Sequence, residues 1–276
     1  MDIELKKTLK QYANTIRKDV VTEVYSAQSG HPGGSLSIAD VMAYLYFKEL
    51  NVDPSNPAWE DRDRFVLSKG HTCPALYSAL AHKGFFDPAE LTSFRKLGHF
   101  LQGHPDMKKI PGIDMSSGSL GQGISAAVGM ALAGKVDKKD YRVFALLGDG
   151  EIQEGQVWEA AMFAAHYKLN NLCVMVDSNG LQIDGPVDEV MSPNPIDSKF
   201  EAFGFRVMVV DGHDFDALEA AFEQLKTPCD NPTAIILKTV KGKGVSFMEN
   251  QAGWHGKAPN EEQYNQAMAD LAALDA

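Results

Sequence analysis

Residues 143–180 read VFALLGDGEIQEGQVWEAAMFAAHYKLNNLCVMVDSNG, and the predicted fold depends on this stretch. It begins with a short apolar run, 143–147, and closes with a second run, 172–177. The residues between them, from about 153 to 168, suit a helix. A strand, a helix and a strand in this order predict a β-α-β unit with parallel strands. Asp149 follows the first strand directly, where a buried carboxylate is costly unless a positive group meets it.

The same alternation continues through most of the chain. Strands made of continuous Val, Leu, Ile and Met, separated by helices, indicate a parallel sheet that is buried on both faces. We therefore predict an α/β fold, with three αβα layers around a mainly parallel sheet, in a single domain over residues 1–276. The expected helices are 3–27, 38–50, 75–84, 89–96, one that ends near 135, 153–168 and 214–226; the expected strands are 64–71, 143–147, 172–177, 205–210 and 234–238.

Two segments read as loops. The glycine-rich stretch SGHPGGSLS, residues 29–37, is expected to be a loop whose last residue, Ser37, caps the next helix. Residues 241–260 have no helical or strand period, and a loop of this length in a compact domain is usually functional or disordered. Because the loop carries Phe247, Met248 and Trp254, we expect an ordered interface loop.

The bulk composition excludes several classes of protein. The chain has 276 residues, of which 44% are apolar, and a net charge of −11. Nucleic-acid binding requires a basic surface, so nucleic acid is not an expected partner. The N-terminus fits neither a signal peptide nor a transit peptide, and no apolar stretch reaches the roughly 20 residues of a membrane span, so no membrane is expected. Three widely spaced cysteines suit a reducing compartment, and we predict a cytoplasmic protein.

Polar residues at the expected strand ends predict a metal site. Asp149 and Asn179 each follow one strand of the β-α-β unit, and parallel strands end at the same edge of a sheet. A carboxylate, an amide oxygen and a backbone carbonyl suit Mg²⁺ or Ca²⁺, above all when phosphate oxygens complete the shell. The Gly150 amide, near a helix start, could face that anion. The alternative is that Asp149 is a turn residue that caps the helix.

Five motifs then match one enzyme family in order. They are SGHPGGSLS (29–37), LSKGHTCPALYSAL (67–80), GHPD with SSGSLGQG (103–106 and 116–123), GDG with NGLQIDG (148–185), and GWHGKAP (253–259). The GDG and the asparagine just under 30 residues later look like the thiamine diphosphate signature, and the whole set resembles transketolase. The resemblance runs from the first helix to about residue 260. It implies the thiamine diphosphate-binding fold.

The resemblance covers only the first, diphosphate-binding domain of a transketolase. It therefore implies the N-terminal subunit of a split enzyme, which pairs with a separate C-terminal subunit, as two copies of each (α2β2). The partner would carry the pyrimidine-binding and C-terminal domains, with the glutamate that protonates the aminopyrimidine. We expect no appreciable activity from this chain alone.

The resemblance also assigns residues, all by their matching motif positions. It implies that thiamine diphosphate and Mg²⁺ (or Ca²⁺) bind at the strand ends. Asp149, Asn179 and the Leu181 carbonyl match the metal ligands. The implied cofactor contacts are His71, Gly118, Leu120, Gly150, Glu154, Asn179, Ile183 and His255.

Histidines make up the implied catalytic set. His31, His71, His104 and His255 lie on family motifs, where the resemblance places them against the cofactor and the substrate hydroxyls. A histidine suits such a place because its ordinary pKa, near 6.5, lets it exchange protons at neutral pH. The remaining histidines match no motif and are expected to be structural or solvated: His82, His99, His166 and His213.

Glu154 and Glu159 have two interpretations. In the family, glutamates at these positions lie at the subunit interface and connect the two active sites. Alternatively, they are first-turn glutamates that the helix dipole favours. Two other motifs carry no separate site: GSLGQG does not fit the dinucleotide fingerprint, and KGKG, residues 241–244, lacks the spacing of a P-loop.

The implied reaction is the transfer of a two-carbon ketol unit from a ketose phosphate to an aldose phosphate. Three alternatives remain open at this point. The chain could serve an unusual ketose, such as a sulfo-sugar or an amino-sugar precursor. It could be the α subunit of another thiamine diphosphate enzyme, such as a 2-oxoacid dehydrogenase, although the histidine set favours sugar chemistry. It could also be a regulatory subunit that has kept only the fold.

Overall fold

The main strands form one five-stranded sheet in the order β1-β2-β3-β7-β6, and all neighbouring strands are parallel. The structure is a computed structural model that describes residues 1–275. The strands are β1 (Arg64–Leu67), β2 (Val143–Gly148), β3 (Leu172–Ser178), β6 (Arg206–Asp211) and β7 (Thr233–Lys238), with a small hairpin of β4 (Leu181–Gln182) and β5 (Gly185–Pro186). The α-helices are α1 (Ile3–Ala27), α2 (Pro32–Ser37), α3 (Ala39–Tyr44), α4 (Cys73–Lys83), α5 (Gln122–Val136), α6 (Gly155–His166), α7 (Val187–Val190), α8 (Ile196–Ala202), α9 (Phe215–Leu225) and α10 (Glu261–Ala273).

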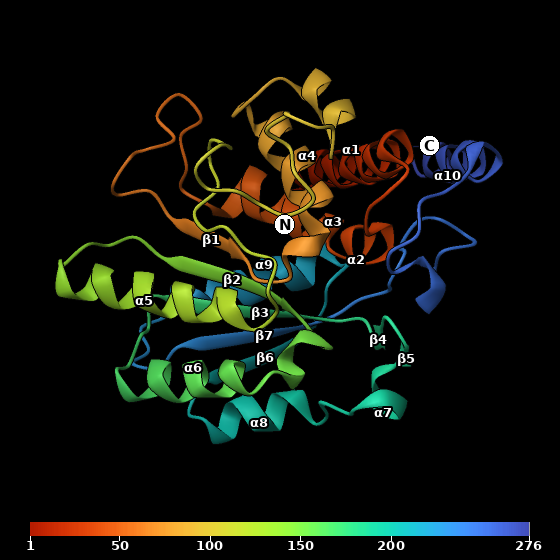
Figure 1. The fold of residues 1–276 in the computed structure, drawn as a ribbon. Coiled ribbons are helices and arrows are strands. Elements are labelled where there is room, and N and C mark those ends of the chain that lie inside the picture. Colours follow the sequence, from red (N-terminus) through yellow and green to blue (C-terminus); the bar gives the residue numbers. More distant parts are fainter. Residues whose placement is uncertain (276) are drawn as a thin grey trace.

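Successive strand side chains enter two separate apolar layers. Phe144 and Leu146 of β2 pack with residues of α1, α3, α4 and α9, whereas Ala145 and Leu147 pack with residues of α5, α6 and α8. This division follows from the two-residue period of a strand. Figure 1 shows the sheet between these two groups of helices. The predicted α/β fold with three αβα layers and a mainly parallel sheet is confirmed.

The carboxyl ends of β1, β2, β3 and β7 lie at one edge of the sheet because these strands are parallel and adjacent. The register pairs Gly148 at the end of β2 with Asp177 near the end of β3. The β4–β5 hairpin and the loop after β7 lie at this edge, on the right of Figure 1. In open parallel sheets ligands bind at this edge.

The glycine-rich stretch 29–37 is not a loop throughout, so that prediction was wrong. Pro32 begins α2, and a proline at the first helical position loses no hydrogen bond. Ser37 does not cap α3; its hydroxyl donates to the Gly34 carbonyl and to Asp177. Gly33 is required for packing, since a Cβ there would lie 2.9 Å from the carbonyl oxygen of Trp254. The glycines therefore allow a buried helix to approach a neighbouring loop closely.

Two predicted helices have different forms. The helix expected over 38–50 is α-helical only to Tyr44, and continues as one wider π-turn over Leu45–Glu49. The helix expected over 89–96 is a 3₁₀ segment, Pro88–Ser93, and Arg95 then takes a positive φ of 60°. Such short, irregular turns are common between regular elements and carry no strong sequence signal.

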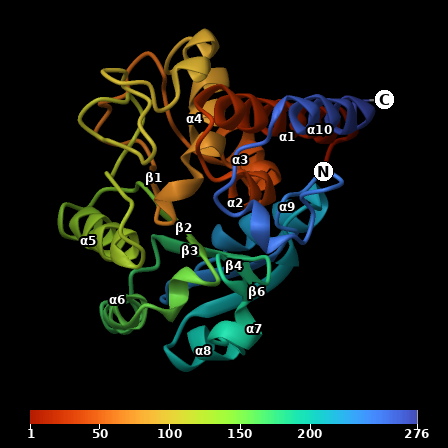
Figure 2. The same ribbon diagram turned by 45° about the vertical axis from the view of Figure 1, so that its right-hand side comes forward.

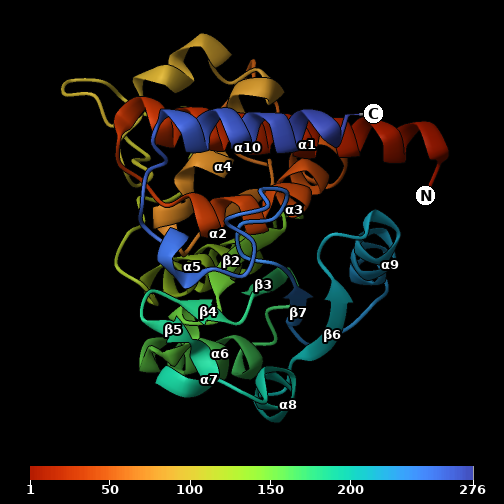
Figure 3. The same ribbon diagram turned by 90° about the vertical axis from the view of Figure 1, so that its right-hand side faces the viewer.

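The C-terminal helix α10 was not predicted. It lies along α1, as Figure 3 shows, and its first residues form a capping box between Asn260 and Gln263. Asn followed three residues later by Gln is a helix-start signal that was present in the sequence. The preceding loop, predicted as an interface loop over 241–260, buries Met248 and Trp254 within this chain, so these two side chains are not available to a partner.

Candidate functional site

A cavity of about 340 Å³ lies at the carboxyl edge of the sheet. Segments that follow β1, β2, β3 and β7 all contribute to its walls. Most of the residues predicted as site residues from the sequence line this cavity, although they are spread widely along the chain. They are His71, Leu120, Asp149, Gly150, Glu154, Asn179, Leu181, Ile183 and His255.

The other three predicted site residues lie beside the cavity. The ring of His31 is 5.1 Å from the ring of His71 and 5.4 Å from that of His255, measured between centroids. His104 lies against Gly118, where a Cβ would come within 3.1 Å of the imidazole. The structure therefore brings His31, His71 and His255 together, whereas His104 lines a separate surface hollow, and the roles assigned to the four histidines stay predictions.

Asp149 is a buried carboxylate without a cation partner among residues 1–275. One oxygen accepts the Gly150 amide at 2.8 Å, and the other accepts the Gly180 amide at 2.6 Å. Burial, with the nearby Asp177 carboxylate, raises the pKa of Asp149 to about 6. Helix α6 begins only at Gly155, so Asp149 does not cap that helix. It instead joins the loop after β2 to the loop after β3.

The remaining predicted metal ligands offer neutral oxygens. Asn179 Oδ1 accepts the Leu181 amide at 3.1 Å, and the Leu181 carbonyl accepts Lys241 Nζ at 2.9 Å. Within the described chain no three His, Cys, Asp or Glu side chains form a metal cluster. One carboxylate and two neutral oxygens leave a divalent cation positively charged, so the donor set fits an ion that also takes anionic ligand oxygens.

The Gly150 amide donates to the adjacent Asp149 carboxylate. Its expected contact with a bound anion stays a prediction. A carboxylate that has no cation nearby accepts the closest free backbone donors, because a buried acceptor without partners is costly.

Two buried lysines were missed by the sequence reasoning. Lys69 follows β1 and bonds to Asp177, and Lys241 follows β7 and contacts His255 Nδ1 at 3.0 Å. Both side chains line the cavity and are almost fully buried. Burial and the neighbouring Lys69 lower the pKa of Lys241 to about 8. The signal for Lys241 was the KGKG stretch, which a comparison with the P-loop alone dismissed, and Lys69 lies in the LSKGH motif.

Asp177 is the centre of the hydrogen-bond network below the cavity. Its carboxylate accepts Ser37 Oγ at 2.6 Å and Asn179 Nδ2 at 2.8 Å, together with Lys69 Nζ and the Thr239 hydroxyl. These donors come from α2 and from the segments after β1, β3 and β7. One buried carboxylate thus holds four segments of the site together.

Glu151 is a further residue that sequence reasoning missed. Its two oxygens accept the Gly121 and Gly148 amides, each at 3.0 Å, and one of them also accepts the Ser68 hydroxyl. Burial raises the pKa of Glu151. The side chain therefore fixes the glycine loop before α5 to the end of β2.

All four histidines assigned to the site have lowered pKa values. Burial, followed by the charge of Arg95, lowers the pKa of His31 to about 4; burial and Lys241 lower the pKa of His255 to about 3. Burial is also the largest cause of the lowered pKa values of His71 and His104. All four rings are therefore neutral at pH 7. Because an ammonium only donates, His255 Nδ1 accepts from Lys241, and the ring proton of His255 is on Nε2.

The two glutamates with two interpretations lie in different places. Glu154 lines the cavity, whereas Glu159 lines a separate hollow of about 320 Å³ between α5 and α6. These helices lie side by side in Figure 2. Met162 of α6 is 61% exposed, and Tyr167, the residue after the end of α6, is 49% exposed. This surface therefore carries apolar side chains that the described residues do not cover.

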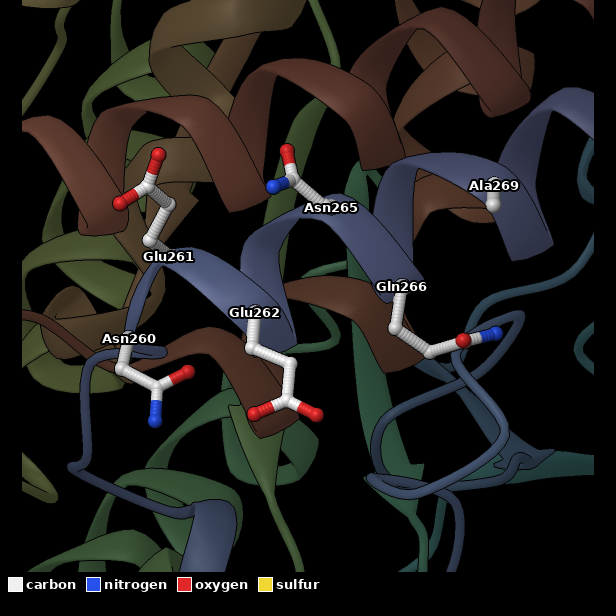
Figure 4. A pocket seen from close by; sticks show the side chains of 6 residues that line it. All are labelled: Asn260, Glu261, Glu262, Asn265, Gln266 and Ala269. Atoms are coloured by element: carbon white, nitrogen blue, oxygen red, sulfur yellow. The ribbon is translucent and has the colours of Figure 1, made fainter.

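A larger surface hollow, of about 760 Å³, lies along α10 but has no site chemistry. Figure 4 shows its lining, which is Asn260, Glu261, Glu262, Asn265, Gln266 and Ala269. It holds no histidine, lysine or buried carboxylate, so it is not the candidate site. Within residues 1–275 no helix is both long and apolar enough to cross a bilayer.

Comparisons with known proteins agree with this geometry. A family model described as "Transketolase, thiamine diphosphate binding domain" matches residues 8–273. The chain is 47% identical to a 6-deoxy-6-sulfo-D-fructose transketolase subunit of Clostridium sp. (strain MSTE9), over 95% of this chain and 96% of that one. It is 42% identical to one of the subunits of an apulose-4-phosphate transketolase from Phocaeicola vulgatus, over 96% and 94% of the two chains.

Longer proteins match over their first part only. Human transketolase is 44% identical over 91% of this chain, which corresponds to 40% of the human chain. The crystal structure of transketolase from Campylobacter jejuni superposes with a TM-score of 0.91 at 36% identity, over 99% of this chain and 43% of that one.

Proposed function

The chain belongs to the transketolase family through its thiamine diphosphate binding domain, and we propose that it is the diphosphate-binding subunit of a two-subunit transketolase. The observation that carries the proposal is the cavity at the carboxyl edge of the sheet, with the uncompensated Asp149 and Lys241 in its walls. Two relatives of nearly the same length are named as transketolase subunits, which supports the two-subunit form.

The residues in the cavity fit thiamine diphosphate with a divalent cation. Asp149, Asn179 Oδ1 and the Leu181 carbonyl would hold Mg²⁺ or Ca²⁺, and the cation would meet the diphosphate. Lys241 supplies a second positive charge to the diphosphate and has no carboxylate partner of its own among residues 1–275. Leu120 and Ile183, both partly exposed at the cavity wall, would pack against the rings. When bound, thiamine diphosphate supplies the electron sink for cleavage beside a ketose carbonyl.

The histidines of this chain would bind the substrate and take part in its proton transfers. The neutral His31 lies beside His71 and His255, and its buried Nδ1 has no partner in the described chain. His255 presents Nε2–H, which donates a hydrogen bond, because its Nδ1 already accepts from Lys241. His71 lines the same cavity, and His104 lies against Gly118. Neutral imidazoles in these places can each accept one hydrogen bond and donate another.

A separate C-terminal subunit would complete the site. We propose two copies of each subunit, with the active sites between them, and the exposed apolar surface of α5 and α6 as a contact between subunits. Glu159 lies on this surface, and Glu154 lines the cavity. Charged side chains in this arrangement could connect two sites of one assembly.

The substrates would be a ketose phosphate as donor and an aldose phosphate as acceptor, as in the pentose phosphate pathway. The names of the two subunit-length relatives favour testing unusual sugars as well, namely a sulfo-fructose and apulose 4-phosphate. A 2-oxoacid dehydrogenase α subunit is not proposed, because the family match is to transketolase. A cytoplasmic location is proposed from the free cysteines alone.

A ketol-transfer assay tests the proposal. The chain alone, and the chain with its C-terminal partner, would be given thiamine diphosphate, Mg²⁺ and a panel of donors with ribose 5-phosphate. The expected result is transfer only in the mixture, with no transfer when the chain carries Asp149→Asn. Transfer at an ordinary rate by the chain alone would overturn the two-subunit proposal, and a mixture inactive with every donor that still binds cofactor would overturn the substrate class.

A further inference from the structure

His213 lies in the loop between β6 and α9 and bonds to two distant parts of the chain. Its Nδ1 is 2.7 Å from Asp40 Oδ2, and its Nε2 is 2.9 Å from the Val240 amide nitrogen. The ring is mostly buried, with 14% of the side chain exposed. The sequence pattern assigned this histidine no role beyond a structural or solvated one.

The two contacts determine where the ring proton is. A backbone amide only donates, so Nε2 must accept from Val240 and has no proton of its own. The proton of the neutral ring is then on Nδ1, which donates to the Asp40 carboxylate. Asp40 is itself paired with Arg17 in the core, which fixes the carboxylate. The imidazole is therefore held in one tautomer and one orientation from the Asp40 side.

Val240 is the residue next to Lys241 in the cavity wall. The Lys241 ammonium reaches the Leu181 carbonyl at 2.9 Å and His255 Nδ1 at 3.0 Å. The backbone on both sides of Lys241 is fixed by hydrogen bonds, at Val240 to His213 and at Gly242 to the Gly33 carbonyl at 2.9 Å. A lysine with several rotatable bonds holds one position only if its own backbone does not move.

We propose that His213 is a positioning residue of the cofactor site, which fixes the Val240 backbone and through it the ammonium of Lys241. The inference rests on the proposed function only where Lys241 is said to meet a diphosphate. The position of Lys241 itself does not depend on any ligand, so it can be measured on the chain alone.

Two substitutions separate the two contacts of the ring. In His213→Gln the amide oxygen takes the place of Nε2 and can accept from Val240. In His213→Asn the amide group takes the place of Nδ1 and can donate to Asp40, but nothing accepts from Val240. His166→Asn is the control, because His166 is exposed on α6.

The first measurements use the full chain without cofactor. Hydrogen exchange at Val240 should be about tenfold faster in His213→Asn than in the wild type and close to wild type in His213→Gln, because only the first variant lacks the acceptor. The rate of Lys241 acylation, measured by mass spectrometry, should rise several-fold in His213→Asn alone, since a released side chain gains access to solvent. Equal behaviour of the two variants, or unchanged rates in His213→Asn, would overturn the inference.

Two further readouts keep the result interpretable. Thermal unfolding identifies a variant that folds poorly; if His213→Asn does so, altered Val240 exchange in a well-folded His213→Gln chain would still refute the inference. Calorimetric titration of the assembled enzyme with thiamine diphosphate and Mg²⁺ should show about tenfold weaker cofactor binding in His213→Asn only. A wild-type assembly that binds no cofactor would refute the proposed function, while the exchange and acylation results would still decide the role of His213.

Discussion

Both ends of the sheet contain buried ion pairs, such as Lys69–Asp177 at the carboxyl end, but only the carboxyl end also holds two buried charged side chains without an ion-pair partner among residues 1–275. At the amino end, Arg142 before β2 pairs with Glu49 and Asp63, and Arg62 pairs with Asp114 at 2.6 Å. At the carboxyl end, Asp149 and Lys241 are just as buried, yet neither forms an ion pair with any of residues 1–275.

This difference separates charges that stabilise the fold from charges that are kept for a ligand. A buried ion whose partner is in the same chain is compensated when the chain folds. A buried ion without such a partner is compensated only when something binds, so it reduces the stability of the free chain. Substitutions at the two ends should therefore have opposite effects on stability and on binding.

The largest effect is expected at the carboxyl end. Asp149→Ala should lower ketol transfer by the assembled enzyme by about a thousandfold, equivalent to roughly 4 kcal/mol, because the proposed metal site would lose its carboxylate ligand. The free energy of unfolding of the ligand-free chain should fall by less than in Asp63→Ala, because the loss of the acceptor for the Gly150 and Gly180 amides is offset by removal of a buried carboxyl that has no ion-pair partner. Rate measurements and urea unfolding on one preparation test both parts, and a clear loss of stability with normal activity would reverse the comparison.

The amino end should respond in the opposite sense. Asp63→Ala leaves the backbone amides of Asn51 and Arg142 without their acceptor and leaves Glu49 as the remaining partner of the Arg142 guanidinium, and it should lower the free energy of unfolding by about 3 kcal/mol. Cofactor affinity of the folded fraction should not change. Asp61→Ala is the matched control, because its ion pair with Lys139 is exposed and should contribute almost nothing. An equal loss in both variants would remove the distinction between the two ends.

The pH should affect the carboxyl end through Asp149. The folded-state pKa of Asp149, about 6, lies above its unfolded value near 3.8. Its contribution to stability is therefore full below about pH 3.8 and is lost as the pH rises through 6. A divalent cation requires the ionised carboxylate. Below pH 6 the affinity for the cation should therefore rise about tenfold (roughly 1.4 kcal/mol) with each added pH unit.

Thermal unfolding with and without Mg²⁺ and thiamine diphosphate, between pH 5 and pH 7, measures this effect. The shift in midpoint should grow with pH in the wild type and should be small and flat in Asp149→Asn. A shift that shrinks toward pH 7 would contradict the assignment of Asp149.

The smallest effect concerns α10, which lies at neither end of the sheet. Asn260→Ala removes the side chain that caps this helix and should lower stability by about 1 kcal/mol without any change in binding. Asn265→Ala, on the exposed face shown in Figure 4, should change stability by a few tenths at most. Equal losses in the two variants would mean that the capping box does not hold α10.

The apolar pattern predicted most of the sheet because buried parallel strands leave a strong and local signal. The strand-end rule then brought Asp149 and Asn179 together, although a whole helix separates them in the sequence. The buried lysines were not predicted, since burial of a charge depends on contacts with segments far away in the chain. The helix α2 was missed for a related reason: its proline and glycines are poor helix formers, and packing against α1, α4 and the segments of Trp254 and Lys241 favours it.

The hydrogen bonds to Asp177 should affect how this protein tolerates substitutions. Four donors from separate segments meet on one carboxylate: Ser37, Lys69, Asn179 and Thr239. Loss of any one donor weakens the attachment of the others, so their substitutions should be epistatic, with double variants less damaging than the sum of the singles. Once one of these residues has changed, retaining the others brings little benefit. We therefore expect related sequences to retain or lose the four donors together.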